Sequence, residues 1–289
     1  MAISRRAALK GLAVAGAAVA GVRPAQAATL PVPQTDAVGL LYDATLCIGC
    51  KTCMVACNEA NGLPADTSGS PAKLYHKPID LSEKAKTVIK LYAQDGEQSF
   101  VKAQCMHCVD PACASACMLG ALKKREFGIV TYNPDLCVGC RYCEVACPFN
   151  VPKFEWSSAA PKIVKCELCK ERLAAGREPA CTEVCPRHAV IFGKRTDLLD
   201  EAHRRLHDTP DRYVPKVYGE TDAGGTQVLY LSHVPFEKVG FPALGDEPAP
   251  SLARSIQHGI YRGFIAPLAL YAALGAVIYR NRRADDNPR

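Results

Sequence analysis

The sequence predicts an α+β fold in which short strands lie beside cysteine-rich loops, with one C-terminal transmembrane helix. Three observations predict it. All 16 cysteines of the 289-residue chain fall into four quartets that open with C-x2-C. Short strand-like runs separate the quartets, and an uncharged apolar run covers 263–279. With 48% hydrophobic and 22% charged residues, the composition is that of a globular chain.

The first 27 residues have the pattern of an export signal. Arg5 and Arg6 stand before an apolar, Ala/Gly-rich stretch, and 25–27 (Ala-Gln-Ala) form a small-residue cleavage site. The arginine pair resembles the twin-arginine signal, although Ala8 stands where that signal usually has Phe. Such export moves folded proteins, so the thiols would not meet an oxidant while unfolded. Without this segment the net charge falls from +6 to about +2, and no nucleic-acid partner is expected.

The apolar run 263–279 is near the lower length limit for a membrane span. Arg280, Arg282 and Arg283 follow it directly. This basic cluster predicts that the C-terminal end lies in the cytoplasm and the body of the chain outside. We therefore expect 251–289 to be a linker, a transmembrane anchor and a short cytoplasmic tail. A buried core helix is the alternative.

The segment 28–250 is the expected working body, and it begins with a spacer at 28–46. The helix that we expect at 197–206 begins at Thr196 or Asp197 as its cap. It should bury one face through Leu198, Ala202 and Leu206. The other expected elements are strands at 87–92, 99–103, 188–193 and 227–231, and a hairpin over 121–133 that turns near Gly128.

The cysteine quartets carry the chemistry. The first, CIGCKTCMVAC at 47–57, recurs as CVGCRYCEVAC at 137–147 with seven of eleven positions identical. In C-x2-C-x2-C loops three thiolates converge on one 4Fe-4S cluster, and in bacterial ferredoxins the fourth cysteine binds the neighbouring cluster. Pro148 and Pro186 complete that pattern in two quartets. The quartets are Cys47, Cys50, Cys53, Cys57; Cys105, Cys108, Cys113, Cys117; Cys137, Cys140, Cys143, Cys147; and Cys166, Cys169, Cys181, Cys185.

Disulfide bonds and structural zinc are the two other uses that the cysteines could have. Disulfides are common in exported chains, but cysteines this close in sequence fit the geometry poorly. Structural zinc takes four ligands and has no use for a third and fourth cysteine at these spacings. A membrane-tethered binding module held by zinc or disulfides is thus the low-ranking alternative to four 4Fe-4S clusters.

No catalytic residue is expected in this chain. It lacks a C-x-x-C-H haem motif, a Gly-rich dinucleotide loop and a nucleophile constellation. We expect His107 to be a hydrogen-bonding or surface residue. Five basic residues near the cysteines either raise cluster potentials or are solvated surface charges: Lys51, Arg141, Lys165, Lys170 and Arg172.

With these motifs, and with the segments "GGTQVL" (224–229) and "IQHGIYRGFIAPLAL" (256–270), the sequence resembles the four-cluster ferredoxin-like subunits of membrane oxidoreductases. It is most similar to the electron-transfer subunit of membrane-bound nickel-iron hydrogenase-2. The β subunit of membrane-bound formate dehydrogenase is the alternative. The resemblance implies tandem bacterial ferredoxin-like modules and four 4Fe-4S clusters.

The resemblance also implies which cysteines share a cluster, because in this superfamily the first quartet pairs with the fourth and the second with the third. It further implies an electron relay from hydrogenase catalytic subunits, with the small subunit as direct donor, to a quinone-reactive integral membrane subunit. The relay would lie on the periplasmic side of the bacterial inner membrane, in contact with the lipid bilayer through its C-terminal helix. The implied ligand sets are Cys47/Cys50/Cys53/Cys185, Cys166/Cys169/Cys181/Cys57, Cys105/Cys108/Cys113/Cys147 and Cys137/Cys140/Cys143/Cys117.

Overall fold

The computed structural model describes residues 36–64, 80–94, 96–158, 161–251, 253 and 265–285. The chain divides into two units, one of Leu30–Pro250 and one of Met1–Thr29 with Ser251–Arg289. The expected export signal lies outside the described residues. All sixteen cysteines lie inside them, in the unit Leu30–Pro250.

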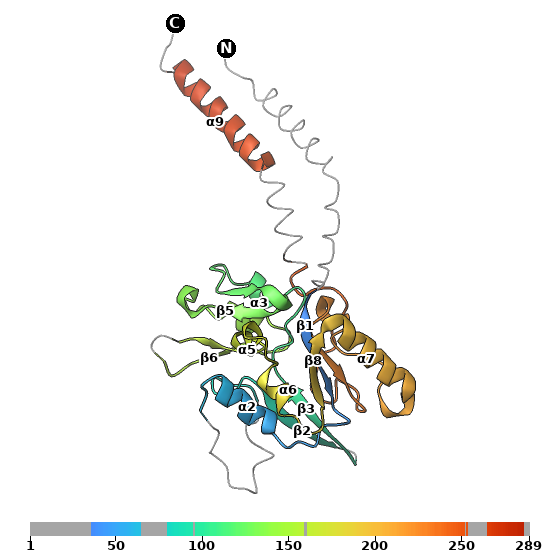
Figure 1. Cartoon of the computed structure of the whole chain (residues 1–289). Coiled ribbons are helices and arrows are strands. Elements are labelled where there is room, and N and C mark those ends of the chain that lie inside the picture. Colours follow the sequence, from blue (N-terminus) through green and yellow to red (C-terminus); the bar gives the residue numbers. More distant parts are fainter. Residues whose placement is uncertain are drawn as a thin grey trace. The chain divides into compact units, whose positions relative to one another are not determined.

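A three-stranded sheet with the order β8-β1-β9 joins distant parts of the chain (Figure 1). Strand β1 (Val38–Asp43) pairs antiparallel with β8 (Val190–Lys194) and parallel with β9 (Val228–Leu231). We expected 28–46 to be a spacer. This expectation is wrong for Val38–Asp43, which form strand β1. This strand is central and buried on both faces, with Leu40 and Leu41 almost fully covered, so its apolar run does not alternate.

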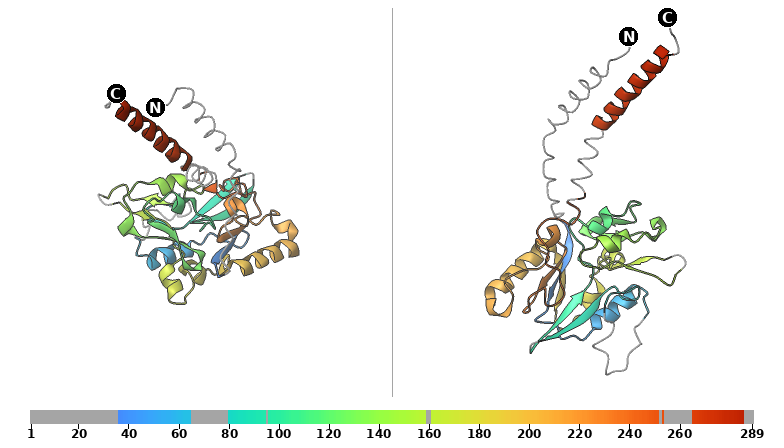
Figure 2. Two further views of the ribbon diagram at one scale, coloured as in Figure 1. Left: turned by 90° about the horizontal axis from the view of Figure 1, so that it is seen from above. Right: turned by 180° about the vertical axis from the view of Figure 1, so that it is seen from behind.

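Helix α7 (Arg195–Asp208) covers one face of this sheet, and both views in Figure 2 agree. Leu198 and Ala202 are buried against it, as the apolar periodicity predicts. The expected cap at Thr196 or Asp197 is wrong, because the helix begins at Arg195 with Lys194 as its cap and without a side-chain cap bond. Strand β8 runs directly into the helix.

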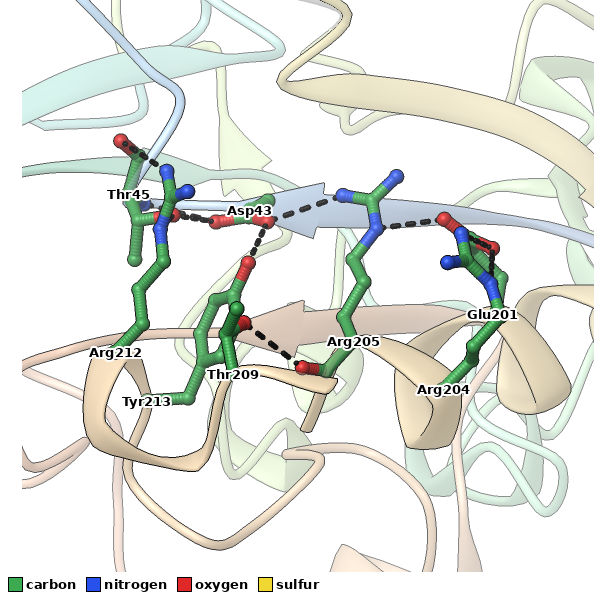
Figure 3. Close-up of polar contacts among 8 residues, drawn as sticks. All are labelled: Asp43, Thr45, Glu201, Arg204, Arg205, Thr209, Arg212 and Tyr213. Carbon is green, nitrogen blue, oxygen red and sulfur yellow. Dashed lines mark hydrogen bonds and ion pairs between the residues drawn. The ribbon is translucent and has the colours of Figure 1, made fainter. Parts of the chain in front are cut away.

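Asp43, at the end of β1, is a buried carboxylate that joins this strand to the segment around α7 (Figure 3). Its Oδ2 accepts hydrogen bonds from Arg205 Nη1 at 3.0 Å and from the Tyr213 hydroxyl at 2.8 Å. Its Oδ1 accepts from the Thr45 amide at 2.9 Å and from the Thr45 hydroxyl. Arg205 also donates from its Nε to Glu201 Oε1 at 2.7 Å. The network fixes the chain just before Cys47.

Three two-stranded hairpins complete the strands of the described residues. The hairpin expected over 121–133 is confirmed, with its turn at η2 (Glu126–Gly128). The expected strands at 87–92 and 99–103 pair with each other. The hairpins are β2 (Val88–Gln94) with β3 (Glu97–Ala103), β4 (Leu122–Lys124) with β5 (Val130–Tyr132), and β6 (Lys153–Phe154) with β7 (Ile163–Val164).

Short helices carry many of the cysteines between these strands. They are too short to be stable alone, and burial of their cysteine-bearing faces has to hold them. These helices are α2 (Thr52–Ala60), α3 (Ala112–Ser115), α4 (Tyr142–Ala146), α5 (Lys170–Ala174) and α6 (Ala180–Glu183), and the remaining 3-10 turns are η3 (Pro134–Leu136), η4 (Pro210–Arg212) and η5 (Asp222–Gly224).

The C-terminal apolar run forms helix α9 (Ile265–Asp285), which belongs to the second unit. Gly263 and Phe264, the first residues of the predicted span, lie outside the described residues. Among the helices of the described residues, none is long and apolar enough to cross a membrane.

Candidate iron–sulfur centres

The two repeated cysteine loops have the same backbone conformation. Gly49 and Gly139 have φ angles of 68° and 70°, and Lys51 and Arg141 have φ angles of 59° and 63°. Each loop therefore bends twice through the left-handed region. The bends turn backbone amides toward sulfur; the amide of Gly49 donates to Cys47 Sγ at 3.4 Å. Such N–H donors stabilise a thiolate.

Group A contains Cys47, Cys50, Cys53 and Cys185. These four thiols, three of them from the first loop, line one small cavity. Burial raises the pKa of Cys53, the charge of Lys102 opposes that rise, and charges on the other three cysteines add to it. The four sulfur atoms are thus close enough to act on one another.

Group B contains Cys57, Cys166, Cys169 and Cys181. They line a second cavity, where helix α2 contributes Cys57 and helix α6 contributes Cys181. Burial raises the pKa of Cys57 well above its usual value, and the other three cysteines of the group raise it further. Asn61 Nδ2 lies 3.7 Å from Cys57 Sγ and donates to it.

Groups C and D combine the second and third quartets. Burial raises the pKa of Cys108 well above its usual value, and Cys105, Cys147 and Cys113 add to the rise. Burial likewise raises the pKa of Cys143 to about 11, and Cys117, Cys137 and Cys140 add to it. Group C is therefore Cys105, Cys108, Cys113 and Cys147, and group D is Cys117, Cys137, Cys140 and Cys143.

Electrostatic contacts between the groups give them an order. The pKa of Cys181 in group B is raised to about 12, mainly by burial and in part by Cys53 of group A. The pKa of Cys105 in group C is raised to about 11 by burial and in part by Cys166 of group B. In the same way burial, with a contribution from Cys143 of group D, raises the pKa of Cys113 in group C to about 12. The groups form the series A, B, C, D.

The two ends of this series approach the surface. Cys50 in group A and Cys140 in group D are exposed, whereas the other fourteen cysteines are buried or partly buried. Exposed apolar residues accompany both ends. Ile48 and Val55 lie beside group A, and the residues beside group D, here called the D patch, are Met118, Leu119, Val138, Tyr142, Val145 and Trp156.

Two lysines are buried among the thiols. Lys165, one of the five basic residues singled out in the sequence, is 2% exposed and donates to the carbonyls of Val130 and Cys166. Lys102 is fully buried and lines the cavities of both group A and group B. Three of the other four basic residues are partly buried and have partners outside the cysteine groups: Arg141 stacks on Trp156 at 4.4 Å, Lys170 pairs with Glu167 and Arg172 pairs with Glu183.

The sequence did not mark Lys102 as a tuning charge, because the cysteines that it faces, among them Cys53 and Cys181, lie far from it along the chain. A signal was present in "SFVKAQC", where a lysine occupies a strand between apolar residues. His107 was expected to hydrogen-bond or to lie at the surface. It is fully buried, its Nδ1 accepts from the Val130 amide at 3.0 Å, and burial lowers its pKa well below the usual value.

The surroundings of the thiols fit an anionic cluster. Two buried donor atoms have no hydrogen-bond partner within the described part of the chain. They are Nε2 of Gln104, which lines the group B cavity, and Nε2 of His107, which stands between Cys105 and Cys108 in the sequence. Donors of this kind suit the sulfur atoms of a 4Fe-4S cluster. A 4Fe-4S cluster takes one thiolate on each of its four irons. Its ligands therefore lie around the cluster and do not converge on one metal ion. No three His, Cys, Asp or Glu side chains of the described residues are placed to hold a single metal ion.

Comparisons with known proteins agree with this chemistry. The 4Fe-4S dicluster domain family matches residues 97–195. The Hydrogenase-2 operon protein HybA of Escherichia coli O157:H7 is 39% identical over 291 residues, covering 88% of this chain and 87% of the relative. The iron-sulfur subunit of the nitrate-inducible formate dehydrogenase of Escherichia coli K12 is 35% identical and covers 86% and 88%. A protein of Nitratidesulfovibrio vulgaris is 45% identical, covering 83% of this chain and 66% of its own length.

Proposed function

Because this chain belongs to the 4Fe-4S electron-transfer subunits of the hydrogenase and formate dehydrogenase family, we propose that it relays electrons from a hydrogenase catalytic partner to a quinone-reactive membrane subunit. The chain binds 4Fe-4S clusters, and its sixteen cysteines suffice for four. Bound clusters supply one-electron transfer. The residues of the chain fix the spacing of the clusters, exclude water and set the local charge.

The observation that carries the proposal is the serial order of the four cysteine groups, with the two exposed cysteines at opposite ends. A protein that consumes a substrate needs one reactive site, whereas a relay needs an entry and an exit. We propose that groups A to D each hold one cluster, with the ligand sets that the family resemblance implies. Electrons would enter at one exposed end and leave at the other.

The apolar surfaces at the two ends support docking of redox partners. Val145 is 86% exposed and Met118 is 83% exposed, both beside group D. Exposed apolar residues gathered around one site are typical of protein interaction surfaces. The catalytic partner would cover one end of the series and the membrane subunit the other.

Hydrogenase is favoured over formate dehydrogenase as the partner. Similarity to HybA is somewhat higher than to the formate dehydrogenase subunit, at 39% against 35% identity over comparable shares of this chain. Anaerobic preparations of the chain and of its complex test the cluster content and the identity of the catalytic partner. The separately purified chain should contain about 16 iron atoms, and the visible absorption of the complex should bleach under hydrogen and not with formate. Bleaching by formate alone would favour the alternative, and a colourless chain would refute the electron relay.

We also propose periplasmic export by the twin-arginine route and anchoring by the C-terminal helix. Leu268, Tyr271 and Leu274 of α9 are exposed, as side chains facing lipid would be, and Arg280, Arg282 and Arg283 favour a cytoplasmic end. Replacing Arg5 and Arg6 by lysine should block export. In cells that lack the quinone-reactive membrane subunit, Leu274→Arg should release the exported chain from washed membranes, whereas Arg282→Lys should not. Membrane retention of the Leu274→Arg chain would contradict the anchor.

A further inference from the structure

Lys102 is a fully buried cation without an ion pair to any carboxylate of the described residues. It lies on strand β3. Its Nζ donates to the Thr87 hydroxyl at 2.6 Å and to the Gln104 side-chain carbonyl. Both acceptors are neutral. Burying an ammonium group without a counter-charge is costly. Negative charge from groups other than these two acceptors therefore has to stabilise the Lys102 ammonium group.

The compensating charges belong to groups A and B. Burial alone would lower the pKa of Lys102, yet the pKa is raised because Cys181, Cys53, Cys57 and Cys166 surround it. Cys53 is in group A, and the other three are in group B. In turn, the charge of Lys102 opposes the rise in the pKa of Cys53, Cys57 and Cys181. Lys102 also lines the cavities of both group A and group B, so its ammonium group faces two neighbouring cysteine groups at once.

The other buried lysine acts further along the series. Lys165 opposes the rise in the pKa of Cys105, Cys113 and Cys147, all of group C. For Cys143 of group D, the charges that contribute most to its pKa are those of other cysteines. Lys102 therefore acts mainly on groups A and B, whose cavities it lines, and group D lies at the far end of the series.

We propose that Lys102 is a positioning residue for electron transfer, a fixed positive charge shared by the clusters of groups A and B that raises the reduction potentials of both. The inference rests on the proposed relay of four clusters. Reduction adds one electron to a cluster and makes it more negative, so a nearby ammonium group stabilises the reduced form. The low dielectric of the interior strengthens this effect. Thr87 and Gln104 hold the charge in place between the two cavities.

Potentiometric EPR titration of the loaded complex tests this proposal. Lys102→Met keeps much of the side-chain length and removes the charge. At a fixed potential near the midpoint, the reduced-to-oxidised ratio of the clusters in groups A and B should fall at least tenfold, which is a 59 mV shift for a one-electron couple. Group C should shift less and group D should not shift. The affected signals should be those that change in Cys53→Ser and Cys57→Ser.

A second variant covers the case in which Lys102→Met fails to fold. Gln104→Glu has nearly the same shape and keeps the lysine. It places a carboxylate against the ammonium group and also removes the Nε2 donor beside group B, so the potentials of groups A and B should fall in the same direction, that of group B more. Lys90→Met is the matched control, because Lys90 lies on the paired strand β2 at the surface, 2.9 Å from Asp80. It should leave all four potentials unchanged.

Unchanged potentials in groups A and B in a folded, fully loaded Lys102→Met or Gln104→Glu chain would overturn the proposal. Equal shifts of all four clusters would overturn it too, since they would indicate a general structural effect. Failure of the relay itself would look different. In that case the wild-type chain would not contain four redox-active clusters, whatever the variants do.

Discussion

Arg205 Nη1 lies 3.0 Å from Asp43 Oδ2, although 162 residues separate the two in sequence. Asp43 is fully buried at the end of β1, and Arg205 is 19% exposed on helix α7. The pair joins the start of the cysteine-bearing chain to the segment that follows the last cysteine. Breaking one partner of a buried pair leaves the other charge uncompensated.

The first prediction follows from this pair. Asp43→Ala should lower the thermal unfolding midpoint of the loaded protein by about 5–10 °C, because Arg205 and the Tyr213 hydroxyl lose their common acceptor. Anaerobic calorimetry checks it. Asp200→Asn, at an exposed position of the same helix, should change the midpoint by about 2 °C or less. An equal effect of both substitutions would show that the buried network contributes nothing.

The second prediction concerns a single thiol. Cys143→Ala should abolish the cluster of group D and lower the iron content from about 16 to about 12 atoms per chain. The cluster of group C should be altered but retained, because Cys143 acts on Cys113 in that group. Iron analysis and EPR of the reduced protein measure both effects. Four unchanged signals would contradict the assignment of Cys143 to group D.

The third prediction separates two effects of replacing a glycine, backbone strain and steric clash. Gly49 has a φ angle of 68°, and a Cβ there would lie 2.3 Å from the ring of Phe100. Gly62 has a φ angle of 61° with open space around it. Gly62→Ala should therefore cost only the backbone strain, about 1–2 kcal/mol. Gly49→Ala adds a clash beside Cys47 and Cys50.

We accordingly expect Gly49→Ala to yield a chain that loads group A poorly, with up to about four fewer iron atoms, while Gly62→Ala loads fully. Iron and sulfide analysis after anaerobic purification distinguishes them. If both variants load all clusters equally well, the contact between Gly49 and Phe100 does not constrain the loop.

The fourth prediction uses the one tryptophan of the chain. Trp156 is 68% exposed, stacks against Arg141 and belongs to the D patch. Binding of a redox partner there should protect Trp156 from quenching by acrylamide. Val145→Asp should weaken the complex about tenfold or more, because it places a charge in an apolar contact. His207→Asp, on the exposed surface of α7, should leave the affinity unchanged.

If the D patch is the docking surface, the complex should both protect Trp156 from acrylamide and bind more weakly in Val145→Asp. If the partner binds with equal affinity to Val145→Asp and Trp156 stays open to acrylamide, the D patch is not a docking surface. Quenching and binding titrations with each purified redox partner, the catalytic one and the membrane subunit, provide both readouts.

Local patterns predicted the elements whose stability is mainly local. A turn at Gly128 between two short strand-like runs predicts the hairpin β4–β5. The four-residue spacing of Leu198 and Ala202 predicts the buried face of α7. Strand β1 was missed because its buried, non-alternating run becomes a strand only by pairing with β8 and β9, which come about 150 and 190 residues later. The start of α7 was misjudged because β8 leads straight into it, without a side-chain cap.

The sequence by itself determined the chemistry of this protein. Four quartets of cysteines at these spacings indicate 4Fe-4S clusters, because spacing along the chain sets which thiolates can converge. Only the tertiary structure decided the serial order of the groups, the exposure of Cys50 and Cys140 at its ends, and the place of Lys102 between groups A and B. The physical reason is that charge acts through space. A lysine on β3 acts on Cys53 and Cys181 because the fold buries all three together, at sequence separations that no local pattern records.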